Sequence, residues 1–223
     1  VDITESVMRY TLTPKADNEW SIYLRENTIS CAETTAAAFN CDMAHSQLIS
    51  QYACKLFDKM KKVHGLDTSK RLILELAAIL HSCGSYVSVR QHNRCTFDII
   101  RGMDLFGLSS AEVLEVAMVA GSVSNYFNME EEPELSAVSQ GEKIVISKLS
   151  AIFRLANAMD KSHLKKLRNI KMTLEDDRVL IRAESSYNTL LERWSFEESS
   201  KFFKDVFGLS PELAIKFDMI DHK

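Results

Sequence analysis

An apolar residue recurs at every fourth position from 44 to 60, and this repeat constrains the fold more than any other feature of the sequence. The repeat and the apolar positions beside it are Ala44, Leu48, Ile49, Tyr52, Ala53, Leu56, Phe57 and Met60. Residues three or four apart lie on one face of an α-helix, so the repeat predicts a helix with one buried face. Asp42 precedes it as an N-cap, and His64 and Gly65 end it.

Similar spacings predict further helices as far as about residue 160. They are expected over residues 28–40, 69–84, 93–103, 109–123 and 141–160. Ser69 is the expected N-cap of the second of these, and Ser109 with Glu112 forms a capping-box pattern. Ile144 and Ile152 belong to the predicted buried side of the last helix. Only seven glycines and three prolines occur in 223 residues, which favours long helices over a loop-rich β fold.

The pattern changes to short strands near the C-terminal end. Residues 170–174 and 178–184 read as two strands of a hairpin. A capping box at Ser195 and Glu198 predicts a helix, and a last strand is expected after Pro211. These elements form a ββαβ unit.

The sequence therefore predicts a mainly α-helical fold in which a helical bundle is followed by a small α+β domain. The expected boundaries place a linker at 1–27, the helical domain at 28–164 and the α+β domain at 165–223.

Charge and cysteine content exclude several classes of protein. The net charge of −4 provides no overall basic field, so neither nucleic acid nor an anionic membrane surface is expected as a partner. No apolar run approaches the roughly 18 residues that suggest a membrane span. The five cysteines are odd in number and form no CxxC pair, which predicts reduced thiols in a cytoplasmic protein, without disulfides or a zinc knuckle.

Residues 74–100 resemble the metal-binding stretch of HD-type phosphohydrolases with ligands missing. In such sites a His followed directly by an Asp places an imidazole and a carboxylate on one divalent cation. Here the pair is His81 and Ser82, and a neutral hydroxyl cannot supply the missing charge. Asn157 stands where the HD pattern ends in an Asp, so a second carboxylate has become an amide.

Four segments in order are similar to the C-terminal region of the exopolyphosphatase and guanosine pentaphosphate phosphatase family. They are AHSQLISQYACKLFDKM, HGLDTSKRLILELAAILHSCG, QHNRCTFDII and KLSAIFRLANAMDKSH, and LLERWSFEESSKFFKDVFG extends the similarity to about residues 28–210. The resemblance implies an HD-like helical domain and a small α/β domain. It also implies that both follow a two-lobed, actin-like ATPase region that carries the phosphate-cleaving chemistry, with residues 1–27 as the tail of that region.

The resemblance leaves five remnant positions of a metal site and no complete ligand set. They are His45, His81, Ser82, His92 and Asn157. We expect no metal or other cofactor in this chain, although a divalent metal is possible in the parent protein. An alternative is that the histidines hold a softer metal such as zinc. Asn125 and Phe127 also replace an Arg and a His of the family, and Asp160 is expected to be a solvated helix-end residue.

Basic residues near these positions are expected to bind a phosphate chain without a metal, because Arg and Lys hold polyanions by charge and hydrogen bonds. The candidate substrate-binding residues are Arg90, Arg94, Lys161, Lys165, Lys166 and Arg168. Lys171 lies beside them at the expected junction of the two domains. The alternative is an ordinary solvated helix end, where lysines complement the helix dipole.

Three functions are compatible with these features. The first is a noncatalytic, substrate-binding, regulatory and dimerising part of an exopolyphosphatase-like phosphatase, with polyphosphate or guanosine pentaphosphate as the ligand and a homodimer as the assembly. The second is a metal-dependent HD-type phosphohydrolase acting on a nucleotide or phosphate ester. The third is a purely structural interaction module. No catalytic residue is assigned in this chain under the first hypothesis, which we prefer.

Overall fold

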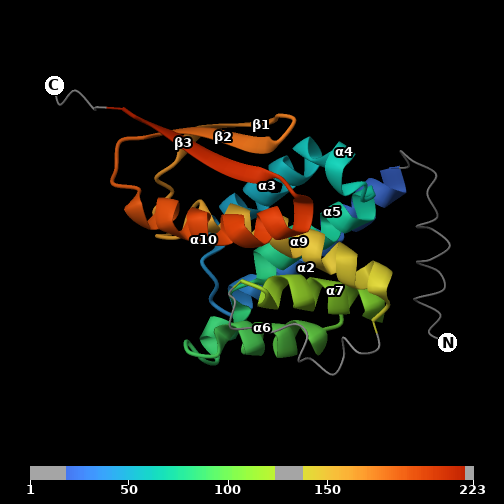
Figure 1. Ribbon diagram of the computed structural model, residues 1–223. Coiled ribbons are helices and arrows are strands. Elements are labelled where there is room, and N and C mark those ends of the chain that lie inside the picture. The colour runs from blue at the N-terminus through green and yellow to red at the C-terminus, as the bar shows by residue number, and fades with distance from the viewer. Residues whose placement is uncertain (1–18, 124–137, 219–223) are drawn as a thin grey trace.

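The computed structural model describes residues 19–123 and 138–218, in which a helical bundle carries a small sheet on one side (Figure 1). The helical elements are α2 (Glu19–Ala38), α3 (Met43–Lys59), α4 (Lys61–His64), α5 (Thr68–Leu80), the 3-10 helix η1 (Cys83–Tyr86), α6 (His92–Arg101), α7 (Ser110–Gly121), α9 (Gln140–Ala158) and α10 (Leu190–Phe207). The strands are β1 (Arg168–Leu174), β2 (Arg178–Ser185) and β3 (Ser210–Phe217). The predicted mainly α-helical fold with a small α+β part is confirmed.

The buried face of α3 begins one residue later than the sequence repeat suggests. Ala44 is exposed and Leu48 is only partly buried, whereas His45 and Ile49 are buried. The helix is therefore rotated so that an imidazole takes the core position that we expected for Ala44. Asp42 caps the helix as predicted, because its carboxylate accepts a hydrogen bond from the backbone N–H of His45.

Helix caps explain most of the other boundaries. Ser109 and Glu112 form the predicted capping box of α7. Ser139 opens α9 in the same way, although we did not predict its cap. The cap of α5 is Asp67 rather than Ser69, since the Asp67 carboxylate accepts hydrogen bonds from the backbone of Ser69 and Lys70. Ile144 is 56% exposed, so the predicted buried side of α9 does not include it.

The three strands form one sheet in the order β1-β2-β3. Strands β1 and β2 pair antiparallel, and β2 and β3 pair parallel with α10 as the crossover between them. A parallel pair needs such a long connection, which is why a helix lies between the last two strands. The predicted ββαβ order is confirmed.

Two helix starts differ from the sequence expectation. Helix α2 begins at Glu19, so the expected linker over 1–27 is helical from that residue onwards, while residues 1–18 lie outside the described part. Helix α10 begins at Leu190, so Ser195 lies inside the helix and forms no capping box. The Asn188 side chain accepts a hydrogen bond of 2.9 Å from the backbone N–H of Leu190, which is a local start signal that the capping-box search missed.

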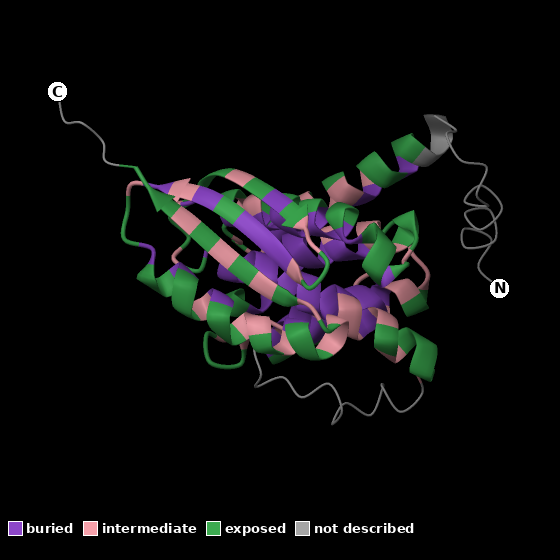
Figure 2. Cartoon of the chain, turned by 45° about the horizontal axis from the view of Figure 1, so that its top comes forward, coloured by how far each residue is buried: buried purple, intermediate pink, exposed green. Residues whose placement is uncertain are grey.

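One hydrophobic core joins the bundle to the sheet (Figure 2). It includes Leu56 and Leu76 from the bundle, Ile181 from β2, and Phe196 and Phe203 from α10. All of these side chains are at most 3% exposed. The division of the chain into a domain at 28–164 and another at 165–223 stays a prediction.

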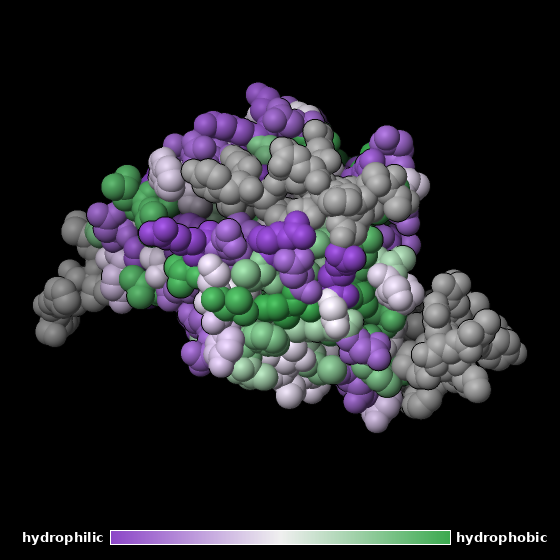
Figure 3. Space-filling view, turned by 90° about the horizontal axis from the view of Figure 1, so that it is seen from below, coloured by the Kyte–Doolittle hydropathy of each residue, from purple (hydrophilic) through white to green (hydrophobic). Residues whose placement is uncertain are grey.

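Large apolar side chains also remain on the surface. One group comprises Tyr86, Val87 and Val89 around η1, and a second comprises Tyr187, Leu190, Leu191 and Trp194 at the start of α10. Seen from below, the molecule presents apolar side chains in a central band between polar ones (Figure 3). No helix within residues 19–123 or 138–218 is long and apolar enough to cross a membrane.

Candidate functional site

His45 and Asp160 form a buried pair where the start of α3 meets the end of α9. The His45 Nδ1 and Asp160 Oδ2 atoms are 2.8 Å apart, and each side chain is 1% exposed. A carboxylate only accepts when ionised, so Nδ1 of His45 donates to Asp160. The Nε2 atom of His45 is buried, with no hydrogen-bond partner in the part of the chain that the structure describes. The expectation that Asp160 is a solvated helix-end residue is wrong.

The loop after α9 wraps around the Asp160 carboxylate. Its second oxygen accepts a hydrogen bond of 2.7 Å from the backbone N–H of Lys165. His163 stacks on His45 with ring centroids 3.5 Å apart, and its Nδ1 lies 3.2 Å from the Asp42 carboxylate. His163 and Lys165 both have positive φ, 58° and 50°, which is uncommon for residues with a side chain. The Asp160 carboxylate therefore holds a strained turn in place.

His81, at the end of α5, faces the same buried cluster. Its ring centroid lies 5.4 Å from that of His45, and its Nδ1 donates to the carbonyl oxygen of Ala78 over 2.8 Å. Burial lowers the pKa of His81 to about 3, and the nearby His45 adds to the shift. His81 is thus a neutral imidazole at physiological pH. Burial and the negative charge of Asp160 likewise raise the pKa of Tyr52 to about 12.

The remaining predicted metal positions are only partly brought together. Asn157 is buried on α9, one turn before Asp160. Ser82 follows His81 directly, and its side chain is partly buried. The side chain of His92 is only partly buried and lies near the surface, its Nδ1 donating to the carbonyl oxygen of Val89 over 3.0 Å. Asn125 and Phe127 lie outside the described residues.

These side chains do not fit a hard divalent cation. Such ions require several oxygen ligands, and the nearby carboxylate of Asp160 is already bound to His45 and to the backbone of Lys165. His45 and His81 contribute two imidazoles only. Among the residues that the structure describes, no group of three or more His, Cys, Asp or Glu side chains is arranged to hold a metal ion.

The cations predicted to bind substrate lie at separate places on the surface. Arg94 is exposed and pairs with Asp98 over 3.0 Å on the outer side of α6. Arg90 is exposed just before α6. Neither Arg90 nor Arg94 lies next to the β1-β2-β3 sheet (Figure 1).

The predicted cations after α9 are partly engaged by neighbours. The ammonium of Lys166 lies 3.4 Å from the Glu192 carboxylate, which is fully buried. Arg168 donates to the hydroxyl of Ser186 over 2.6 Å. Lys161 and Lys165 are exposed in the loop.

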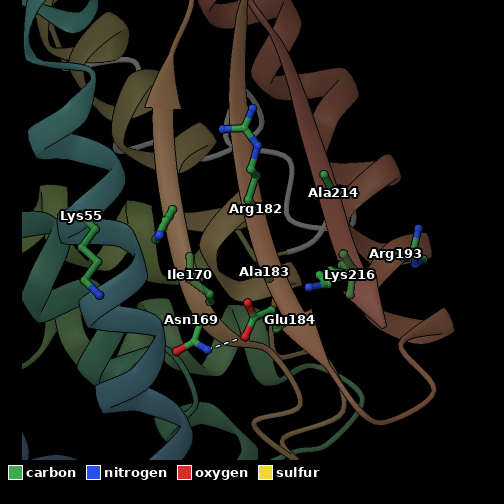
Figure 4. A pocket seen from close by; sticks show the side chains of 11 residues that line it. Lys55, Asn169, Ile170, Arg182, Ala183, Glu184, Arg193, Ala214 and Lys216 are labelled. Carbon is green, nitrogen blue, oxygen red and sulfur yellow. Dashed lines mark hydrogen bonds between the residues drawn. The ribbon is translucent and has the colours of Figure 1, made fainter. Parts of the chain in front are cut away.

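A basic hollow of about 1040 Å³ lies along the sheet, and none of the six predicted cations lines it. It is lined by Lys55, Asn169, Ile170, Lys171, Arg182, Ala183, Glu184, Arg193, Ala214, Ile215 and Lys216. Figure 4 places Lys55 on α3 at one side, Arg182 on the middle strand, and Lys216 and Arg193 at the other side. Among the described residues, the lining thus contains five cations and one carboxylate, Glu184.

The strand register explains how these cations meet. Lys171 of β1 lies opposite Arg182 of β2, and Arg182 lies beside Ala214 of β3. Side chains at paired positions point to the same face, and the small Ala214 leaves room between its larger neighbours. Glu184 is hydrogen-bonded to Asn169. Lys171 and Arg182 can be read from the sequence as two cations in neighbouring strands. That they lie opposite each other depends on the register between β1 and β2.

The fold defines a mainly α-helical protein with a three-stranded ββαβ sheet and a basic sheet face. The family model for Ppx/GppA phosphatase, domain III, matches residues 24–199. The chain therefore belongs to the Ppx/GppA phosphatase family, whose members act on polyphosphate-type substrates. The resemblance inferred from the sequence is confirmed. No curated protein matches the chain.

Proposed function

We propose that this chain is a substrate-binding part of an exopolyphosphatase-like phosphatase and that a phosphate chain binds in the basic hollow of the sheet. The observation that carries the proposal is the composition of the hollow, which has five cations against a single carboxylate. The sequence placed the candidate phosphate-binding cations Lys161, Lys165, Lys166, Arg168 and Lys171 at the junction of the two expected domains, and of these Lys171 lines the hollow.

The electrostatics of the sheet face support an anionic ligand. Lys171 and Arg182 lie directly opposite each other, and like charges in such positions destabilise a sheet. Within the described residues, Lys55, Lys171, Arg182 and Lys216 pair with no carboxylate. A bound polyanion would relieve this repulsion through charge-assisted hydrogen bonds.

The lining favours a linear phosphate chain over a guanosine nucleotide. Guanine is usually held by stacking on an aromatic ring and by hydrogen bonds to its edge. Among the described residues, no aromatic side chain lines the hollow, and the lining carboxylate, Glu184, is already bound to Asn169. A phosphate chain needs only cations spaced along a surface.

The alternative of a metal-dependent HD-type phosphohydrolase has less support. Ser82 and Asn157 are neutral, and Asp160 is engaged by His45. We therefore assign the phosphate-cleaving chemistry of the parent protein to a region other than this chain. A cytoplasmic location, expected from the cysteine content, stays a prediction.

Dimerisation is a second proposed role, and it rests on the apolar start of α10. Tyr187, Leu190 and Trp194 are 58%, 71% and 59% exposed. Large exposed apolar groups mark interaction surfaces, and a second copy of the chain is the occupant expected here. Sedimentation analysis of the chain and of the Leu190→Glu, Trp194→Glu variant tests this role; a monomer at all concentrations contradicts it.

Binding of polyphosphate at several KCl concentrations tests the main proposal. The Lys171→Ala, Arg182→Ala variant should bind at least about tenfold more weakly and with a shallower salt dependence, because two phosphate contacts are lost. The matched control is Lys59→Ala, Lys62→Ala, which removes two exposed lysines outside the hollow and should change affinity little.

A third variant separates the hollow from the loop after α9. Lys161→Ala, Lys165→Ala removes two of the cations predicted from the sequence and should leave binding unchanged. The proposal is wrong if this variant loses affinity while the Lys171→Ala, Arg182→Ala variant binds like the unmodified chain. Competition by guanosine tetraphosphate should be no stronger than that by a short inorganic polyphosphate of equal charge.

A further inference from the structure

The thiols of Cys41 and Cys83 touch although they lie 42 positions apart in the chain. Their Sγ atoms are 3.5 Å apart. We propose that Cys41 and Cys83 are a modification site, at which a low-molecular-weight disulfide such as glutathione disulfide converts the two thiols into a reversible protein disulfide. This proposal is independent of the proposed function.

The positions of the two residues permit the bond. Cys41 lies in the turn between α2 and α3, and Cys83 is the first residue of η1, after the turn that ends α5. A disulfide requires an Sγ–Sγ distance of about 2.05 Å, so the sulfurs must approach by roughly 1.5 Å. Turns absorb such a shift more easily than the middle of a helix.

The two thiols differ in exposure and in pKa, and this difference determines which of them reacts first. Cys41 is partly exposed, whereas Cys83 is fully buried. A hydrogen bond from the Cys83 thiol lowers the pKa of Cys41 to about 7, with Ser82 adding to the shift, while the same contact and burial raise the pKa of Cys83. Cys41 is therefore the attacking thiolate, since the thiolate is the nucleophile and its access limits the rate.

The reaction balances in two exchange steps. The Cys41 thiolate attacks one sulfur of glutathione disulfide, its S–S bond breaks, and one glutathione thiolate leaves. The Cys83 thiol then loses its proton to that thiolate and attacks the Cys41 sulfur, which releases the second glutathione. Two protein thiols are oxidised and one small disulfide is reduced to two thiols.

The other cysteines lack such a partner within the described residues. Cys31 and Cys95 are partly exposed and have no sulfur neighbour there. Cys54 is buried, and burial raises its pKa to about 12. Selective oxidation is thus expected at one pair only.

The disulfide would hold the start of α3, which carries His45, close to the end of α5, which carries His81. Cys41 is followed by Asp42, which caps α3 through the backbone of His45. Cys83 follows His81 and Ser82 at the end of α5. The disulfide therefore joins the turn that precedes α3 to η1, which follows α5, and it closes a long loop of the unfolded chain.

Incubation of the purified chain with glutathione disulfide, followed by alkylation and peptide mapping, tests the proposal. We expect a Cys41–Cys83 linked peptide and a fall in alkylated cysteines from five to three, the two in the bridge being lost. The Tm should rise by about 10 °C and return on addition of dithiothreitol. The Cys31→Ser, Cys95→Ser variant should behave like the unmodified chain.

Two results would overturn the proposal. One is a stable glutathione adduct on Cys41 with Cys83 still open to alkylation after unfolding. The other is a linked peptide that joins any other pair of cysteines. Both are read from the unmodified chain, so they do not depend on the folding of a variant. Cys41→Ser should abolish the Tm shift, and the loss of that shift adds a second measurement.

Discussion

The Nδ1–H group of His45 donates to the Asp160 carboxylate over 2.8 Å, and both side chains are 1% exposed. The pair joins the start of α3 to the end of α9 across 115 residues of sequence. A buried carboxylate is stable only when its oxygens are hydrogen-bonded, and the second Asp160 oxygen accepts from Lys165 N–H. The His45–Asp160 pair thus acts as a structural link between two helices and a strained loop.

Asp160→Asn should destabilise the chain by about 2–4 kcal/mol, because a charged partner is removed from a buried pair. Urea unfolding measures the loss. The matched control is Asp176→Asn in the exposed β1–β2 turn, which should change stability by less than about 0.5 kcal/mol. Equal effects of the two substitutions would show that the buried pair contributes little.

The low pKa of His81 should make the chain lose stability as the pH falls. Unfolded His81 binds a proton below its ordinary pKa of 6.5, whereas folded His81 does so only near 3. The unfolded state therefore binds more protons between these values, which lowers stability by up to about 1.4 kcal/mol per pH unit on acidification.

Urea unfolding of the chain and of His81→Asn at several pH values from 7 down to about 4 measures this slope. The asparagine amide can still donate to the Ala78 carbonyl but does not titrate. The variant should show a shallower loss of stability with falling pH. Parallel curves for the two proteins would mean that His81 is protonated equally in the folded and unfolded states.

Gly84→Ala should be one of the most damaging single substitutions in the chain. An added Cβ would lie 2.0 Å from the carbonyl oxygen of His92 and 2.3 Å from the backbone nitrogen of Thr96. Backbone atoms cannot move aside cheaply, so we expect a loss of about 3 kcal/mol or more. Gly141→Ala, whose Cβ would approach only the Ser139 hydroxyl at 3.9 Å, should be neutral or stabilising. Thermal unfolding of both variants provides the comparison.

Glu192→Gln should loosen the connection between the bundle and the sheet. The fully buried Glu192 accepts from the backbone N–H of Ser162 and from Lys166. Removing its charge weakens both contacts, and a loss of about 1–2 kcal/mol is expected. Hydrogen exchange in residues 160–168 should rise in this variant but not in Glu197→Gln, which changes an exposed carboxylate on the same helix.

Local signals predicted the helices and the ββαβ order well. The spacing of Leu56 and Met60 indicated the buried face of α3, and the capping box at Ser109 marked the start of α7. The same signals failed at Ser195, because α10 already begins at Leu190, whose backbone N–H donates to the Asn188 side chain. They also failed at Ala44, which the rotation of α3 leaves exposed.

The candidate sites were less predictable than the fold because they join distant residues. Nothing near Asp160 in sequence indicates that its carboxylate meets His45, since the contact depends on how α3 crosses α9. Nor does the sequence reveal that Lys171 opposes Arg182, because a slip of one residue in strand register would turn one of them to the other face.

Periodicity, caps and turn residues act over a few residues, so the order of amino acids alone specified which segments are helices and strands and that the histidines lie at helix ends. Helix crossing angles and strand register arise from burying all apolar faces at once. The combined burial of these faces also buried Asp160, placed Cys41 against Cys83, and brought five cations from α3, α10 and the sheet around one hollow.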